Sequence, residues 1–145
     1  MTISLTNLDD NLWNIMYNHL QTGTYAISTD NIHGAMNDVQ IDSEGYPQVI
    51  ILTPKYELSK ITMDGKHTQL DVNFNVQVFH TNGENIKLLF GEIVGKILSG
   101  ESVFLAEGLS QMKIISGTHD YYTTGNKKIH YMTKDFNFVL RLVKT

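Results

Sequence analysis

"QLDVNFNVQVFH", residues 69–80, alternates polar and apolar side chains along almost its whole length. The apolar positions are Leu70, Val72, Phe74, Val76 and Val78, and the polar ones are Gln69, Asp71, Asn73, Asn75 and Gln77. A period of two is typical of a β-strand that turns one face to a hydrophobic core. The stretch is roughly twice as long as an ordinary strand of about 5–6 residues. The sequence therefore predicts one long strand with an apolar inner face and a polar outer face.

The polar face of this strand is almost uncharged, because Asp71 is the one carboxylate among its five positions. A solvated strand face usually carries Lys, Glu or Thr, and Asn is a poor strand former. Two interpretations stay open. The face contacts another protein surface, where charged residues are depleted, or it is a wet strand face in a chain rich in Asn and Gln.

The composition describes an ordinary globular protein. The 145 residues fit a single domain, 1–145, large enough to bury a core. The net charge of −4 gives no reason to bind nucleic acid over the whole surface, and the absence of cysteine excludes disulfides and thiolate chemistry. The N-terminus lacks the pattern of a signal peptide, and the longest aliphatic run, Val49 to Leu52, is far too short to span a bilayer.

The segments before the long strand predict a helix and then strands. Apolar residues recur at helical spacing from Asn7 to Thr22, behind a capping box formed by Thr6 and Asp9. The stretch Tyr25–Gly34 has no clear period and is predicted to be a loop. A hairpin follows from Val39 to Leu52, turning at Ser43–Gly45, and Pro54 closes it. A third strand, Tyr56–Met63, leads through a turn at Asp64-Gly65 into the long strand.

The segment after the long strand predicts the clearest helix of the chain. Its apolar stripe is Ile86, Leu89, Phe90, Ile93, Val94, Ile97 and Leu98. Asn82 is expected to cap its start and Gly100 its end. Leu88, Gly91 and Gly95 lie on the opposite side. Each glycine inside a helix costs about 1 kcal/mol relative to alanine. Either another backbone approaches this face closely, or selection at these positions is weak.

The last third of the chain predicts two further strands. They are Met112–Ile115 and Ile129–Val143, separated by a Gly- and Thr-rich loop, Ser116–Asn126. A phase shift near Thr133 predicts a bulge or a bend in the last strand. The expected fold class is α+β: a curved antiparallel sheet packed by two helices, in the order helix, strands, helix, two strands.

The sequence carries no recognisable catalytic pattern. Its six histidines are His19, His33, His67, His80, His119 and His130, and none has the spacing of a common metal site. There is no G-x-S-x-G elbow and no phosphate-binding glycine loop. Lys127-Lys128 is the single basic pair and is expected to be solvated. We therefore expect a protein that is not an enzyme and that uses no metal and no cofactor.

The order of these segments carries a resemblance. "YPQVIIL" is followed by "HTQLDVNFNVQVFHT", which runs straight into "NGENIKLLFGEIVGKIL", and the chain closes with "KDFNFVLRLV". In length, element order and pattern the chain resembles the tail terminator (tail completion) proteins of long-tailed phages and related viruses. The resemblance covers nearly the whole chain, and it includes no invariant motif.

The resemblance implies a structural role without cofactors. Such proteins form hexameric rings on the last ring of a tail tube, stop its growth and face the head connector, while DNA passes through the lumen. The expected partners are further copies of the chain, the tail tube protein and the connector, and the expected location is the tail or neck of a virion assembled in the host cytoplasm. Another neck, head-completion or tail tube protein, or a small monomeric interaction protein, remains the alternative.

Two sets of residues are then candidate contact sites. The subunit interface is expected on the polar strand face and on the glycine side of the second helix: Gln69, Asp71, Asn73, Asn75, Gln77, Leu88, Gly91 and Gly95. A contact between two different patches closes into a ring by rotation. The loop near the C-terminal strand is expected to touch a partner through Tyr121, Tyr122, Lys127 and Lys128.

Overall fold

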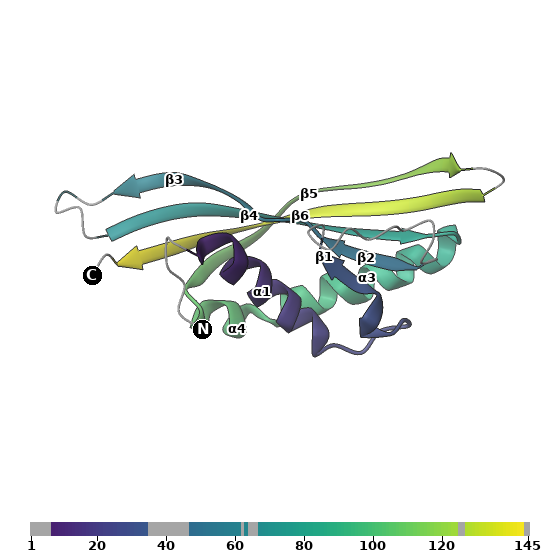
Figure 1. Ribbon diagram of the computed structural model, residues 1–145, viewed down its shortest axis with the longest axis horizontal. Helices are drawn as coiled ribbons and strands as arrows, with labels where there is room; N and C mark the ends of the chain where they lie inside the picture. The colour runs from purple at the N-terminus through teal and green to yellow at the C-terminus, as the bar shows by residue number, and fades with distance from the viewer. Residues whose placement is uncertain (1–6, 35–46, 62, 64–66, 125–126, 144–145) are drawn as a thin grey trace.

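The computed structural model of the chain describes residues 7–34, 47–61, 63, 67–124 and 127–143. Within these ranges a six-stranded sheet is accompanied by three α-helices and one 3-10 turn (Figure 1). The elements in chain order are α1 (Leu8–Gln21), the 3-10 turn η2 (Thr29–Asn31), β1 (Ile32–Gly34), β2 (Gln48–Ile51), β3 (Lys55–Ile61), β4 (His67–His80), α3 (Gly83–Ser99), α4 (Glu101–Ala106), β5 (Leu109–Thr124) and β6 (Lys127–Val143). The fold is α+β, as the sequence predicts.

The long strand predicted from the alternating stretch is β4, and it lies at the centre of the sheet. The strand order is β1-β2-β4-β6-β5, with β3 paired to β4 outside this path. One edge of β4 pairs with β6 along its whole length, while the other edge is shared by β3 and β2. The chain passes from β2 to β3 through Leu52–Pro54, so these two strands act as one strand with an interruption opposite Phe74 and Asn75.

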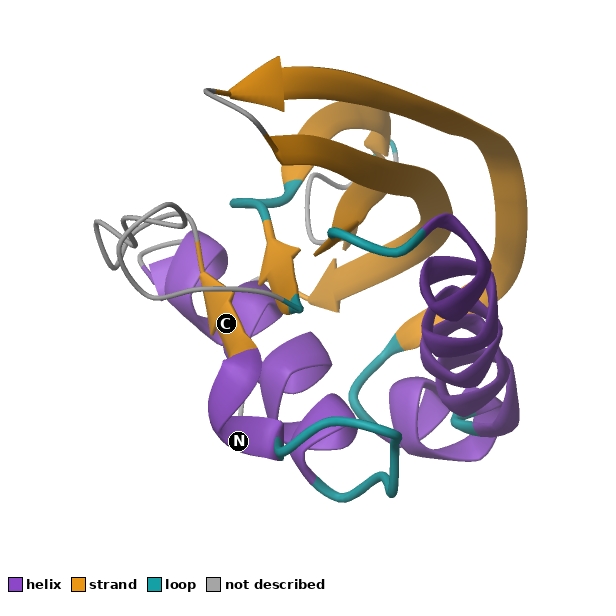
Figure 2. Cartoon of the chain, turned by 90° about the vertical axis from the view of Figure 1, so that its right-hand side faces the viewer, coloured by secondary structure: helices purple, strands orange, loops and turns teal. Residues whose placement is uncertain are grey.

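The helices gather on one side of the sheet (Figures 1 and 2). Their apolar stripes meet the inner face of β4, where Val72, Phe74, Val76 and Val78 have no exposed surface. At the end formed by β3 and β4 the strands extend beyond the helices (Figure 1). The polar face of β4 points away from the helices, which places the predicted contact face on the uncovered side of the sheet.

The predicted helix boundaries hold closely. Helix α1 falls within the predicted range, and α3 begins directly after Asn82. The Asn82 side chain accepts hydrogen bonds from the backbone N–H groups of Glu84, at 2.9 Å, and Asn85, at 3.0 Å. Thr6, expected to cap α1, lies outside the described residues, and the residue at the N-cap position is Asn7. The Asn7 Oδ1 atom accepts from Asn11 Nδ2 at 2.7 Å.

Two expectations about the sheet are wrong. The sheet is mixed, because β1 runs parallel to β2, whereas we expected a purely antiparallel sheet. It is also an open, twisted layer that reaches past the helices, in place of a strongly curved sheet wrapped on them (Figure 1). The parallel pair lies in the stretch predicted to be a loop, Tyr25–Gly34. A three-residue strand is too short to produce a detectable period, so the pattern missed it.

A third helix, α4, was not predicted. Gly100 is the C-cap residue of α3, as the sequence predicts, but its φ of −92° and ψ of 13° are not the left-handed values of a helix-terminating glycine. The chain therefore turns once at Gly100 and continues as a short helix, in which Phe104 N–H donates to the Gly100 carbonyl at 3.0 Å. Phe104 is fully buried, which anchors α4 to the core.

The C-terminal hairpin also differs from the prediction. Strand β5 continues to Thr124, so most of the expected loop Ser116–Asn126 is paired strand. The bulge predicted near Thr133 is absent from the unbroken β4–β6 register; two irregularities lie in β5 instead, at Ser110/Lys113 and Ile114/Ser116. The expected turns at Ser43–Gly45 and Asp64-Gly65, and the strand around Val39, fall outside the described residues.

Candidate functional site

The polar face of β4 is half-buried although no helix covers it. All five predicted positions, Gln69, Asp71, Asn73, Asn75 and Gln77, are of intermediate exposure. Their neighbours on β6 in the same register are Arg141, Val139, Asn137, Asp135 and Thr133. The two rows shield each other, since directly opposite side chains on paired strands lie about 5 Å apart. The structure therefore brings the predicted residues together as one polar surface.

Asp135 organises the centre of this surface. Its Oδ1 atom accepts a hydrogen bond from Asn75 Nδ2 at 2.7 Å and a longer one from Asn73 Nδ2 at 3.4 Å. Hydrogen bonds to a charged group are the stronger kind. Because the Asn75 amide turns its Nδ2 toward the carboxylate, its Oδ1 is buried with no partner in the described part of the chain. These contacts explain why Asn is present in a long strand, where its propensity is low.

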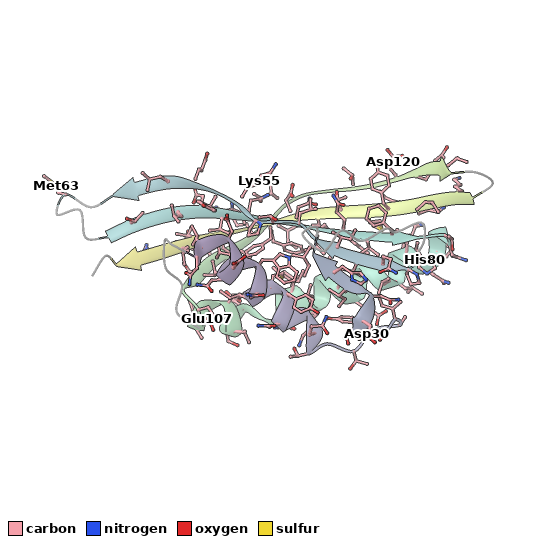
Figure 3. All side chains as sticks on the ribbon, in the orientation of Figure 1. Asp30, Lys55, Met63, His80, Glu107 and Asp120 are labelled. Carbon is pink, nitrogen blue, oxygen red and sulfur yellow. The ribbon has the colours of Figure 1, made fainter. Side chains whose placement is uncertain are left out.

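Two open clefts lie where β2 gives way to β3. A cleft of about 350 Å³ is lined by Leu52, Thr53, Lys55, Asn73, Asn75, Gln77 and Asp135. A second, of about 230 Å³, is lined by Lys55, Tyr56, Glu57, Asp71, Asn73 and Asn137. Lys55 borders both, on the side of the sheet away from the helices (Figure 3). Most of the residues that line both clefts are polar, unlike those of the largely apolar pockets that hold small ligands.

The glycine side of α3 is open. Leu88 is 69% exposed, and Gly91 and Gly95 are exposed as well. Outside their own helix turns, no heavy atom of the described residues lies within 4 Å of a Cβ placed on either glycine. Leu98, 44% exposed, continues the same line one turn further on. The close approach that would explain these glycines is therefore not made by the described part of the same chain.

The residues expected in a partner-contact loop lie on paired strands. Tyr121 and Tyr122 belong to β5, opposite His130 and Ile129 of β6, and Lys127 and Lys128 belong to the start of β6. Lys128 Nζ lies 3.9 Å from the centre of the Tyr121 ring, a cation–π contact on an exposed aromatic. The expectation of a loop was wrong, because the Gly and Thr residues that suggested it are accommodated in a long hairpin.

Two histidines, His119 and His130, meet on the helix side of this hairpin, next to His80 of β4. His119 Nε2 lies 3.3 Å from His130 Nδ1, and His130 pairs in register with His80 on β4. Partial burial, followed by the charges of Lys128, His119 and Lys87, lowers the pKa of His130. Burial and the neighbouring His130 also lower the pKa of His80. His80 and His130 are therefore both biased toward the neutral imidazole.

Two exposed apolar residues were missed by the sequence analysis. Tyr56 is 44% exposed and Leu58 is 56% exposed, although both lie on the helix-facing side of β3. Their positions in an alternating strand predict burial. Their exposure follows from the position of β3, which pairs with β4 alone among the described strands. Sequence periodicity does not report where a strand lies in its sheet, so no signal in the sequence could have found it.

Searches for a metal site, a membrane-spanning helix and a known relative all gave negative results. No group of three or more His, Cys, Asp or Glu side chains in the described ranges could hold a metal ion. Among those ranges there is also no helix both long and apolar enough to cross a membrane. The chain matches no protein-family model, and it matches no curated protein.

Proposed function

We propose that this chain is a structural subunit that assembles with copies of itself into a ring, and that the ring ends a viral tail tube and joins it to the head connector. The observation that carries the assembly is the open glycine side of α3, formed by Leu88, Gly91 and Gly95. The placement in a tail rests on the resemblance in element order to tail terminator proteins.

The argument for self-association is energetic. Each of the two glycines costs the helix about 1 kcal/mol relative to alanine. Nothing in the described part of the chain occupies the space that the missing side chains leave. An exposed leucine directly precedes them on the same side of the helix, where a partner's side chains can pack. Contact with another chain offsets the cost, because small residues let a partner approach the helix backbone closely.

The uncovered polar face of the sheet is the second contact surface of the proposed subunit. Its amides and the Asp135 carboxylate form a fixed pattern of donors and acceptors with little net charge. Such a surface is suited to a wet, polar contact with the tail tube or connector. The exposed Tyr121 and Lys128 at the far end of the β5–β6 hairpin supply a further contact of the same kind.

The test is the mass of the purified chain by multi-angle light scattering over a wide concentration range, with negative-stain images of the same sample. Rings of about six subunits support the proposal. A chain that stays monomeric, alone and after mixing with tail tubes, and that does not bind those tubes, contradicts it and favours a monomeric interaction protein. Binding to the end of tubes, as opposed to their sides, separates a terminator from a tube subunit.

A further inference from the structure

Strand β3 exposes apolar side chains on the face that a core would be expected to cover. Tyr56 and Leu58 pair in register with Val72 and Leu70 of β4, whose side chains are buried among the core residues. Among the described strands, β3 pairs with β4 alone, and its outer part reaches past the helices (Figure 1). Met63, fully exposed, marks the tip of this projection (Figure 3). Isolated exposed apolar residues are common, but two on one face of a projecting strand indicate a contact.

Helix α3 offers a recess of matching size. The line Leu88, Gly91, Gly95 and Leu98 consists of two glycines between two exposed leucines, which we call the α3 stripe. Gly91 and Gly95 lie about 6 Å apart along the helix axis. Tyr56 and Leu58 lie about 6.7 Å apart along their strand. The two projecting side chains therefore fit the spacing of the two recesses.

Charge at the rims of the two surfaces is also complementary. The exposed carboxylates of Glu84 and Glu101 lie near the two ends of the α3 stripe. Glu84 Oε1 also lies 3.7 Å from Lys87 Nζ, an exposed ion pair within the helix. The exposed Lys55 directly precedes Tyr56. Lys55 lies on the opposite face of β3 from Tyr56 and Leu58, and its long stem can reach round the edge of the strand to bring its ammonium group to such a carboxylate. Opposite charges at the rim favour this pairing over contact between two identical surfaces.

We propose that Tyr56 and Leu58 of one copy dock on the α3 stripe of the next copy. This inference rests on the proposed function and names the two surfaces that join neighbouring subunits. The surfaces belong to different elements, so the contact is heterologous, and repeating it builds a ring when the rotation between copies closes. It assigns the glycine side of α3 to β3 of the neighbouring copy and leaves the polar face of β4, whose central amides already bind Asp135, outside this junction.

A single junction of this kind is small compared with a stable interface of about 800 Å² per partner. Flanking residues must add to it, and ring closure gives every subunit two junctions. The proposal therefore predicts assembly that depends steeply on protein concentration.

The test uses two variants of the full chain that each block one side of the junction. Leu58→Asp places a carboxylate on the strand surface, and Gly95→Trp fills the recess. Each variant alone is expected to be monomeric under conditions where the natural chain assembles. A 1:1 mixture is expected to form heterodimers and nothing larger, because the first variant keeps its α3 stripe and the second keeps its strand surface. The controls use Asn18, an exposed position on α1 away from the stripe: Asn18→Trp matches the added bulk, and Asn18→Asp matches the added negative charge.

A cysteine cross-link gives a second measurement that does not depend on blocking. The chain has no cysteine, so Leu58→Cys and Gly95→Cys introduce the only thiols in a mixed sample. Oxidation of the mixture is expected to give a dimer of twice the chain mass on a non-reducing gel. The pair Glu57→Cys and Asn18→Cys, with Asn18 on α1, serves as the control and is expected to remain mostly uncross-linked.

The outcomes separate the two proposals. If the natural chain assembles and both blocking variants assemble equally well, the junction proposed here is wrong while the ring function stands. If both variants are monomeric but their mixture does not pair, the contact is not the heterologous one proposed. If the natural chain stays monomeric at every concentration, alone and with tail tubes, both proposals fail. Thermal unfolding of every variant checks that it is folded.

Discussion

His19 Nε2 donates a hydrogen bond to the backbone carbonyl of Lys96 across 2.7 Å, which joins α1 to the last turn of α3. The same ring meets Phe104 of α4 edge-on, with ring centres 5.0 Å apart, and it lies directly over Gly100. One side chain therefore fixes the positions of all three described helices, and its surroundings favour the neutral imidazole. Burial is the main cause that lowers the pKa of His19 from its usual value near 6.5.

The stability of the protein is expected to fall in mild acid. The folded chain binds the His19 proton less readily than the unfolded chain, so this contribution is complete above pH 6.5 and is lost as pH falls through the folded pKa. His80 and His130 have pKa values lowered in the same direction. Urea unfolding at pH 7.5 and pH 5.5 measures the loss. The substitution His19→Gln should cost about 1–3 kcal/mol at pH 7.5 and reduce the loss between the two pH values. An unchanged loss would show that His19 is not responsible.

Alanine should raise the stability of the protein at two glycines within α3 and lower it at the glycine that ends the helix. Gly91→Ala and Gly95→Ala meet open space, so each should stabilise the isolated subunit by about 0.5–1 kcal/mol through helix propensity. Gly100→Ala places a methyl group inside the His19 ring and should destabilise by about 1–3 kcal/mol. Thermal unfolding of the monomer at low concentration measures all three. A loss of stability in Gly91→Ala would mean that this side of the helix is covered.

The contact between Asn75 and Asp135 should contribute measurably to stability. A double-mutant cycle with Asn75→Ala and Asp135→Ala isolates their interaction from other effects of each substitution. A hydrogen bond to a charged group on a half-buried surface should give a coupling free energy of about 1–2 kcal/mol. The matched cycle pairs Gln77→Ala with Asp135→Ala and should give a smaller value. Coupling below the error of urea unfolding would mean that the polar face is only loosely ordered.

The cap of α3 should be worth about 1 kcal/mol. Asn82→Ala removes the side-chain oxygen that accepts from two backbone N–H groups at the start of the helix. Asn85→Ala lies three residues further on and keeps the cap, so it serves as the control and should be neutral or slightly stabilising. Equal effects of the two substitutions, measured by urea unfolding, would contradict the capping role.

The sequence by itself determined β4 and α3. Both follow from local patterns, a period of two over 69–80 and a gapless helical stripe from Ile86 to Leu98, and such patterns report which side of an element is buried. The cap at Asn82 is equally local, because the residues that it serves lie within three positions. The short β1 and α4 were missed since three and six residues carry too little pattern.

Only the tertiary structure decided which surfaces remain open. Nothing in the sequence around Gly91, Gly95 and Gly100 shows which of them is covered. In the structure the first two face open space, and the third is covered by a histidine 81 positions earlier in the chain. Asn75 finds Asp135 through a strand pairing across 60 residues, and Tyr56 and Leu58 are exposed although their register partners on β4, Val72 and Leu70, are buried. Periodicity fixes the face of an element on which a residue lies. What covers that face depends on contacts between distant segments, which appear only when the chain folds.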